Sequence, residues 1–165
     1  MEDRVRNIII KYGSAILSTD TFKKTFEQKH HLHLTVGDHT LGVTEEAVKM
    51  CLKRGIIDSA TLKNVVTASL CHDLGIMGRN EKFKNVIECH TMHPEESVKV
   101  YRELTGEDDP RVVDAILHHM FPIKPGRPKY TEGWILTAAD KKASVKEKTG
   151  TKVISDRDRM ELLSC

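Results

Sequence analysis

The hexapeptide Leu-Cys-His-Asp-Leu-Gly at residues 70–75 closes a strongly apolar helical segment. Asp58-Ser59 predicts the start of this helix, because Asp and Ser side chains cap helix N-termini, and Gly75 predicts its end. Successive helical residues diverge by about 100°, so His72 and Asp73 can bind one ion only if it lies between them, beyond the helix end. A charge pair is the simpler alternative, but the helix dipole disfavours a carboxylate at a C-terminus. The pair is therefore a candidate metal site.

On both sides of this segment, apolar residues recur every three or four positions, with little of the alternation typical of strands. We therefore predict an all-α protein, a compact helical bundle with the metal site between its central helices. Other helices are expected at about residues 38–53 and 131–148, and after the start signals Thr19-Asp20-Thr21, His93-Pro94, Asp109-Pro110 and Ser155. No linker is evident. This predicts a single domain over 1–165, with a helical extension at about 1–35, a motif-bearing core at 36–148 and a short helix at 152–164.

The composition is that of an ordinary soluble domain, since 26 basic and 24 acidic residues give a formal net charge of +2. A charge so near zero argues against bulk nucleic acid as a partner, because such binders usually carry a strongly basic face. The four cysteines are scattered, so we expect reduced thiols. The apolar run Ile8–Ile10 is too short for a signal peptide or a membrane span. These features predict a cytoplasmic protein with no membrane partner.

Nine histidines stand out, and helical periodicity separates them. His39 precedes Val43 by one turn on an apolar stripe, so it is expected to face inward. An isolated inward histidine is more often a satisfied core residue than a ligand. His119 lies three residues after Ile116 on another apolar stripe, whereas His118 shares its face with polar residues. His119 is therefore the better ligand candidate of the pair.

Asp140 ends the segment Ile-Leu-Thr-Ala-Ala-Asp at residues 135–140, where a carboxylate stands among small and apolar side chains. Burial of that charge is costly unless it is paired or coordinates a cation. A lone structural aspartate is the alternative. The candidates on inner faces or at helix ends are His39, His72, Asp73, His93, His119 and Asp140, and several helices can bring them to one pocket. We interpret His30, His31, His33 and His90 as loop histidines, and Cys71 as a small buried side chain rather than a nucleophile.

The order His39, His72-Asp73, Asp140 resembles the HD-domain superfamily of metal-dependent phosphohydrolases, all-helical proteins named after the adjacent His-Asp pair. Residues 70–75 are similar to the family's central motif, and Ala-Ala-Asp-Lys at 138–141 is similar to its closing aspartate. His93-Pro94 and His119 resemble the two extra histidines of its dinuclear branches. The segment His-Met-Phe-Pro-Ile at 119–123 is similar to one in small bacterial single-domain members. The likeness extends from about residue 36 to residue 148.

This resemblance implies a metal centre and a reaction. A first divalent ion would be bound by His39, His72, Asp73 and Asp140, and Asp73 would bridge to a second ion held by His93 and His119. Mixed nitrogen and oxygen ligands suit Mn²⁺, Fe²⁺, Zn²⁺, Ni²⁺ or Co²⁺. The implied activity is hydrolysis of a small phosphate ester, a nucleotide or related compound, by metal-activated water, with His72, Asp73 and Asp140 as the catalytic core.

Four cations are candidates for binding the substrate phosphate. Three lie in the Pro- and Gly-rich segment 122–129, between two expected ligands, and one follows Asp140: Lys124, Arg127, Lys129 and Lys141. A solvated basic loop is the alternative. Two departures from the family matter. Many members have lysine where this chain has Ile76, and no Gly-Tyr-Pro follows His118-His119, which disfavours cyclic-di-GMP as the substrate.

Two other functions would use the same residues. One is a mixed-valence di-iron oxygenase with the same six ligands, as some HD-domain relatives are. The other is a helical sensor or partner-binding module that keeps a metal for folding alone. The same residues are compatible with a single ion at the four-ligand site or with two ions.

Overall fold

The structure, a computed structural model, describes residues 1–30, 34–150 and 154–164. Within these ranges the chain forms helices and one isolated β-bridge, between Lys29 and Thr35, with no strand. The prediction of an all-α fold is confirmed. The longer helices are α1 (Asp3–Leu17), α3 (Val36–Lys53), α4 (Ser59–Cys71), α6 (Val86–Thr105), α7 (Pro110–His118), α8 (Thr131–Lys148) and α9 (Asp156–Leu163). The short elements are α2 (Asp20–Lys23), η1 (Lys24–Phe26), η2 (Leu74–Ile76) and α5 (Arg79–Lys82).

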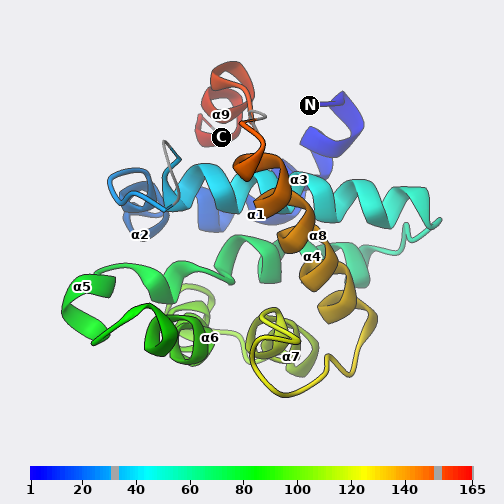
Figure 1. Cartoon of the computed structure of the whole chain (residues 1–165). Coiled ribbons are helices and arrows are strands. Elements are labelled where there is room, and N and C mark those ends of the chain that lie inside the picture. The colour runs from blue at the N-terminus through cyan, green and yellow to red at the C-terminus, as the bar shows by residue number, and fades with distance from the viewer. Residues whose placement is uncertain (31–33, 151–153, 165) are drawn as a thin grey trace.

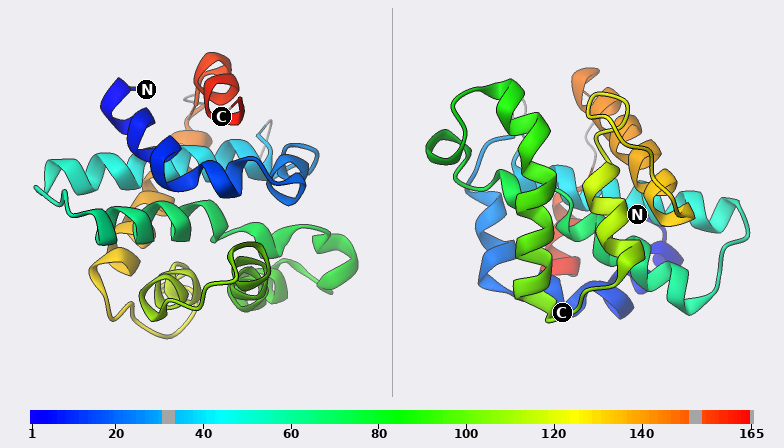
Figure 2. Two further views of the ribbon diagram at one scale, coloured as in Figure 1. Left: turned by 180° about the vertical axis from the view of Figure 1, so that it is seen from behind. Right: turned by 90° about the horizontal axis from the view of Figure 1, so that it is seen from below.

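Helices α3 and α4 form the central pair of the bundle. Helix α8 crosses in front of both (Figure 1), and α1 packs on their opposite side, as the view from behind shows (Figure 2). Helices α6 and α7 contact each other below this pair, and α7 also packs against α4 and α8. Apolar side chains from the four helices α3, α4, α7 and α8 meet in one core, for example Leu41, Leu70, Ile116 and Leu136. Their packing brings together segments that are far apart in the sequence.

Helix start signals act largely as predicted. The side chains of Thr19, Asp58, Asp109 and Ser155 each accept a backbone hydrogen bond at the start of a helix. The start of α3 differs from the prediction, because this helix begins at Val36 rather than near Asp38. Thr35 is its cap, and the Asp38 carboxylate accepts a bond from the Thr35 backbone in a reciprocal capping box. Asp38 is therefore part of the first turn.

The prediction that His93-Pro94 opens a helix is wrong. Helix α6 begins at Val86, where Asn85 caps it by accepting a hydrogen bond from the Glu88 backbone N–H at 2.9 Å. Pro94 lies inside this 20-residue helix. A proline in a helix interior removes one backbone donor and costs about 3 kcal/mol, which the tertiary packing of α6 offsets. As a result, His93 lies on a continuous helix rather than at its end.

Cys51, Cys71 and Cys89 are buried free thiols, whereas Cys165 lies outside the described residues. Burial raises the pKa of Cys71 to about 12. Since the thiolate is the nucleophilic form, this neutral thiol fits the predicted structural role. Among the residues that the structure describes, no helix is both long enough and apolar enough to cross a membrane.

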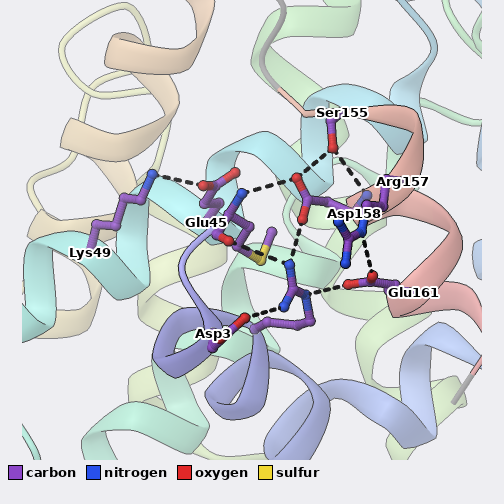
Figure 3. A network of polar contacts seen from close by, with 9 residues as sticks. Asp3, Glu45, Lys49, Ser155, Arg157, Asp158 and Glu161 are labelled. Carbon is purple, nitrogen blue, oxygen red and sulfur yellow. Dashed lines mark hydrogen bonds and ion pairs between the residues drawn. The ribbon is translucent and has the colours of Figure 1, made fainter.

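The two ends of the described chain are joined by an ion-pair network (Figure 3). Arg6 on α1 donates to Asp158 on α9 at 2.8 Å, and it also pairs with Glu161 and Asp3. Ser155 donates a further hydrogen bond to Asp158 at 2.5 Å. Although burial opposes ionisation, these donors hold the pKa of Asp158 well below its usual range. The charge of Asp158 therefore helps to hold α9 against α1.

Replacing Asp158 with Asn should lower the free energy of unfolding by about 1–2 kcal/mol at pH 7, because a largely buried ion pair is lost. A depressed carboxyl pKa contributes stability above its unfolded value, about 3.9, and loses it as pH falls. The difference from the wild type should therefore shrink below about pH 4. Urea unfolding across pH would measure it. Asp3→Asn, which removes an exposed partner of the same Arg6, should cost less than about 0.5 kcal/mol, and an equal cost for both variants would contradict the prediction.

Candidate metal centre

The six predicted ligands come from separate helices and meet at one place. His39 lies on α3, His72 and Asp73 directly follow α4, His93 lies on α6, His119 directly follows α7, and Asp140 lies on α8. All are buried except Asp140, whose side chain is 16% exposed. Two groups have their ligand atoms within 4.8 Å of one another, namely His39, His72 and Asp140, and Asp73, His93 and His119. The structure thus brings the six predicted residues together, although the first group lacks the Asp73 of the expected four-ligand set.

The carboxylate of Asp73 lies between these sets. Its Oδ1 is 3.2 Å from His93 Nε2 and 3.6 Å from His119 Nε2. Its Oδ2 is 3.6 Å from His72 Nε2 and 3.7 Å from His39 Nε2. The two oxygens therefore face different imidazoles, which is the arrangement that a bridging carboxylate requires. On the Oδ2 side, His39 Nε2 also lies 3.2 Å from Asp140 Oδ1.

The other ring nitrogen of each histidine is held by an acceptor. Nδ1 bonds the backbone carbonyl of Ser69 in His72 (2.7 Å), of Cys89 in His93 (2.8 Å) and of Ile116 in His119 (2.6 Å). Because a carbonyl oxygen only accepts, each Nδ1 carries a proton, and in the neutral ring Nε2 presents a lone pair to the centre. Such outer contacts orient metal-binding histidines. In His39, Nδ1 instead lies 2.6 Å from the Glu147 carboxylate.

The donor set fits a divalent ion. His72 Nε2 is buried and has no hydrogen-bond partner, which is costly for a polar atom. His93 Nε2 and His119 Nε2 lie 3.0 Å apart, so a proton or a metal ion must separate their lone pairs. Imidazole nitrogen and carboxylate oxygen are the donors that Mn²⁺, Fe²⁺, Co²⁺, Ni²⁺ and Zn²⁺ take in proteins. An ion in each group would satisfy all these atoms.

The charges of the centre favour the binding of a cation. Burial alone would raise the pKa of Asp73 and Asp140, but the neighbouring histidines outweigh it. They hold the pKa of Asp73 well below its usual range and lower that of Asp140 to about 2. Burial lowers the pKa of His72 to about 4, so this ring is neutral at pH 7. Burial opposes the charged form of His39, yet Asp140 and Glu147 raise its pKa to about 10. In His119, Asp73 likewise outweighs burial and raises the pKa.

Sequence reasoning missed two residues of the centre. Glu147, only 1% exposed in its side chain, holds His39, and its position two turns after Asp140 on α8 is a signal that could have identified it. His30, interpreted as a loop histidine, forms a third group of close ligand atoms with His39 and Asp73. It lies in an irregular segment, where no periodicity indicates which way a side chain points.

The remaining histidines lie elsewhere or outside the description. His118 Nδ1 contacts the carbonyl and the carboxylate of Asp114, both at 3.0 Å, while His119 faces Asp73. His90 lines the cavity next to the centre but belongs to none of the ligand groups found among the described residues. His31 and His33 lie outside the described residues.

A cavity of about 420 Å³ opens onto the two ligand groups. Of the four cations predicted to bind phosphate, only Lys141 lines it, and Arg79 and Lys148 line it as well. Lys124 lies in an ion pair with Glu95 on the neighbouring helix α6. Arg127 and Lys129 are not among the lining residues. The cationic wall therefore comes from α5 and α8 rather than from the predicted loop, whose Lys129 backbone N–H instead donates to the Asp114 carboxylate on α7 at 2.8 Å.

The chain belongs to the HD domain family, whose model matches residues 36–144. This family generally contains metal-dependent hydrolases, and its members bind divalent metals. Searches of curated proteins and of solved structures gave no significant match. The match includes all six predicted ligands, and the metal binding of the family is consistent with the observed groups of histidine and aspartate residues.

Metal binding should release protons near neutral pH. The pKa of His39 is about 10, so at neutral pH its ring carries a proton on each nitrogen, and an ion at Nε2 must displace one of them. Asp73 raises the pKa of His119 in the same direction. Affinity should therefore rise with pH. Isothermal titration with Zn²⁺ in two buffers of different ionisation enthalpy measures the released protons. Asp73→Asn, which removes the bridging charge, serves as the control without specific binding. Heats that depend on neither buffer nor pH would contradict the prediction.

Glu147→Gln should weaken metal binding by about 10-fold or more, because loss of an orienting partner typically costs 10- to 100-fold in affinity. Glutamine keeps the shape but removes the charge that supports His39. Chelator competition would measure the affinity. Glu46→Gln is a matched control, since Glu46 is equally buried between α3 and α8 but pairs with Lys142 and Lys146. Similar losses in both variants would assign the effect to helix packing.

Proposed function

We propose that this protein is a metal-dependent phosphohydrolase that acts on a small phosphate ester, a nucleotide or related compound. The observation that carries the proposal is the placement of the Asp73 carboxylate between two histidine groups, at the base of a cavity with a cationic wall. Membership of the HD domain family supports the same class of reaction. The buried free thiols support a reducing compartment such as the cytoplasm.

The cavity suits a small anionic substrate. Its volume of about 420 Å³ lies within the range of small-molecule sites, roughly 300–1,000 Å³. Ile76, which stands where many family members have lysine, is one of its apolar lining residues, and Arg79 brings a cation to the same cavity three residues later. Lys141 and Lys148 lie on α8. We propose that these three cations bind phosphate oxygens.

Divalent ions supply Lewis acidity toward phosphoryl oxygens and lower the pKa of water. The residues of the chain hold the ions and orient the substrate. Asp73 and Asp140 hold negative charge that would repel a phosphate by itself, so ions must be bound before the substrate. Burial lowers the pKa of Lys141, whose Nζ donates to the Phe121 carbonyl. That bond fixes the side chain at the cavity wall, where its remaining donors can orient the ester.

A panel of phosphomonoesters, nucleotides and dinucleotides, with protein loaded with Mn²⁺, Fe²⁺ or Ni²⁺, tests the proposal. Release of phosphate or nucleotide that Asp73→Asn abolishes would support it. No hydrolysis together with O₂ consumption by the iron-loaded protein would favour the oxygenase. If Asp73→Asn lowers Tm and no turnover is found with any metal, a metal used for folding alone is the better explanation.

Arg79→Ala should lower kcat/KM by about 10- to 100-fold, because a hydrogen bond between charged groups is worth roughly 1.5–3 kcal/mol. The loss should appear mainly in KM if Arg79 binds phosphate equally in the ground and transition states. Steady-state kinetics on the best substrate of the panel would measure it, with metal content checked in parallel. Lys129→Ala removes a cation that does not line the cavity, and its kcat/KM should stay within about twofold of the wild type. An equal loss in both variants would point to a general charge effect.

A further inference from the structure

We propose that His30 is an additional protein ligand of the ion held by His39, His72 and Asp140. The notable feature is its position at the centre. Its side chain is 8% exposed, and its Nε2 lies 3.9 Å from Asp73 Oδ2. His30, His39 and Asp73 offer ligand atoms that all lie within 4.8 Å of one another. The inference rests on the metal centre of the proposed function but on no particular substrate.

The spacing around Asp73 Oδ2 is that of ligands around an ion. The Nε2 atoms of His30, His39 and His72 lie 3.9, 3.7 and 3.6 Å from this oxygen. Bonds from zinc to nitrogen or oxygen are about 2.0–2.2 Å long, so two ligand atoms on one such ion lie about 3–4 Å apart. These separations are too long for hydrogen bonds. They leave space for a cation between the donors.

The segment that carries His30 is fastened to the segment that carries Asp73. Gln28 donates to the Ile76 carbonyl at 3.0 Å and accepts from the Gly78 backbone N–H at 2.7 Å. The Gln28 carbonyl in turn accepts from the N–H of Val36, the first residue of α3, at 2.9 Å. The His30 ring lies 4.4 Å, centroid to centroid, from the His39 ring. These contacts position His30 relative to both neighbours before any ion binds.

The extra ligand would make the two ions unequal. With His30, five protein groups would hold the first ion, through three imidazole nitrogens and two carboxylate oxygens. The second ion, with Asp73, His93 and His119, would have three protein donors and a more open shell. A nitrogen-rich first site also favours Fe²⁺, Co²⁺, Ni²⁺ or Zn²⁺ over Mg²⁺. The substrate phosphate would then engage mainly the second ion.

His30→Ala tests the inference by metal affinity. Competition with a chelator for Zn²⁺ and for Co²⁺ should show one of the two sites weakened by about 10- to 100-fold, with a changed visible spectrum for bound Co²⁺. Added imidazole should restore the spectrum and affinity in the variant, because it can occupy the space left by the side chain and bind the ion. His90→Ala, which removes another half-buried histidine of the same cavity, should bind as the wild type does and show no imidazole rescue.

Metal-free His30→Ala should melt at the wild-type temperature. If it melts lower, His30→Gln replaces it, with the same expected loss. Wild-type affinity and an unchanged Co²⁺ spectrum in the variant would overturn the inference while leaving the proposed hydrolysis intact. A protein with His30-dependent metal affinity that cleaves no phosphate ester would support the inference and overturn the proposed function.

Discussion

The buried carboxylate of Asp73 is the constraint on which the rest of the centre depends. A charge removed from water is costly unless other groups compensate it, and here the compensation comes from imidazoles on every side. Those imidazoles are buried too, and the negative charge of Asp73 in turn compensates them. An ion on each side of the carboxylate would satisfy the lone pair of His72 and separate those of His93 and His119. The helices pack around this cluster of mutually compensating side chains.

Local backbone geometry prepares the ligands before the helices meet. Three of the histidines donate Nδ1–H to a carbonyl three or four residues earlier, which fixes the tautomer and aims Nε2 away from the helix. Two of them, His72 and His119, are the C-cap residues of α4 and α7. The last carbonyl groups of a helix have no intrahelical donor, so they can accept these hydrogen bonds. His39 lies on the continuous helix α3, and a buried glutamate takes the place of the carbonyl.

The helices could largely be anticipated because they follow from short-range rules. The same rules indicated that His39 and His119 face inward, as both do, whereas the full set of six candidate ligands came from the resemblance to the family. Caps at Asp58, Asp109 and Ser155 depend on neighbouring backbone donors, and an apolar stripe indicates which face of a helix is buried. The rules failed where two local signals competed, since the cap at Asn85 started α6 before His93-Pro94. They also failed for the cations at the cavity, because Arg79 and Lys148 reach it from elements whose mutual packing no local pattern describes.

The sequence by itself therefore determined the all-α class, the family and which histidines and aspartates to consider, since each depends on residue types at fixed spacing along the chain. Tertiary structure alone decided that the two oxygens of Asp73 face different histidines, that Glu147 supports His39, and that His30 approaches the same carboxylate. The physical reason is distance along the chain. Apart from His72, which is next to Asp73 in the chain, these contacts join residues about 20 to 110 positions apart, and only the packing of the helices into one core brings them within ångströms.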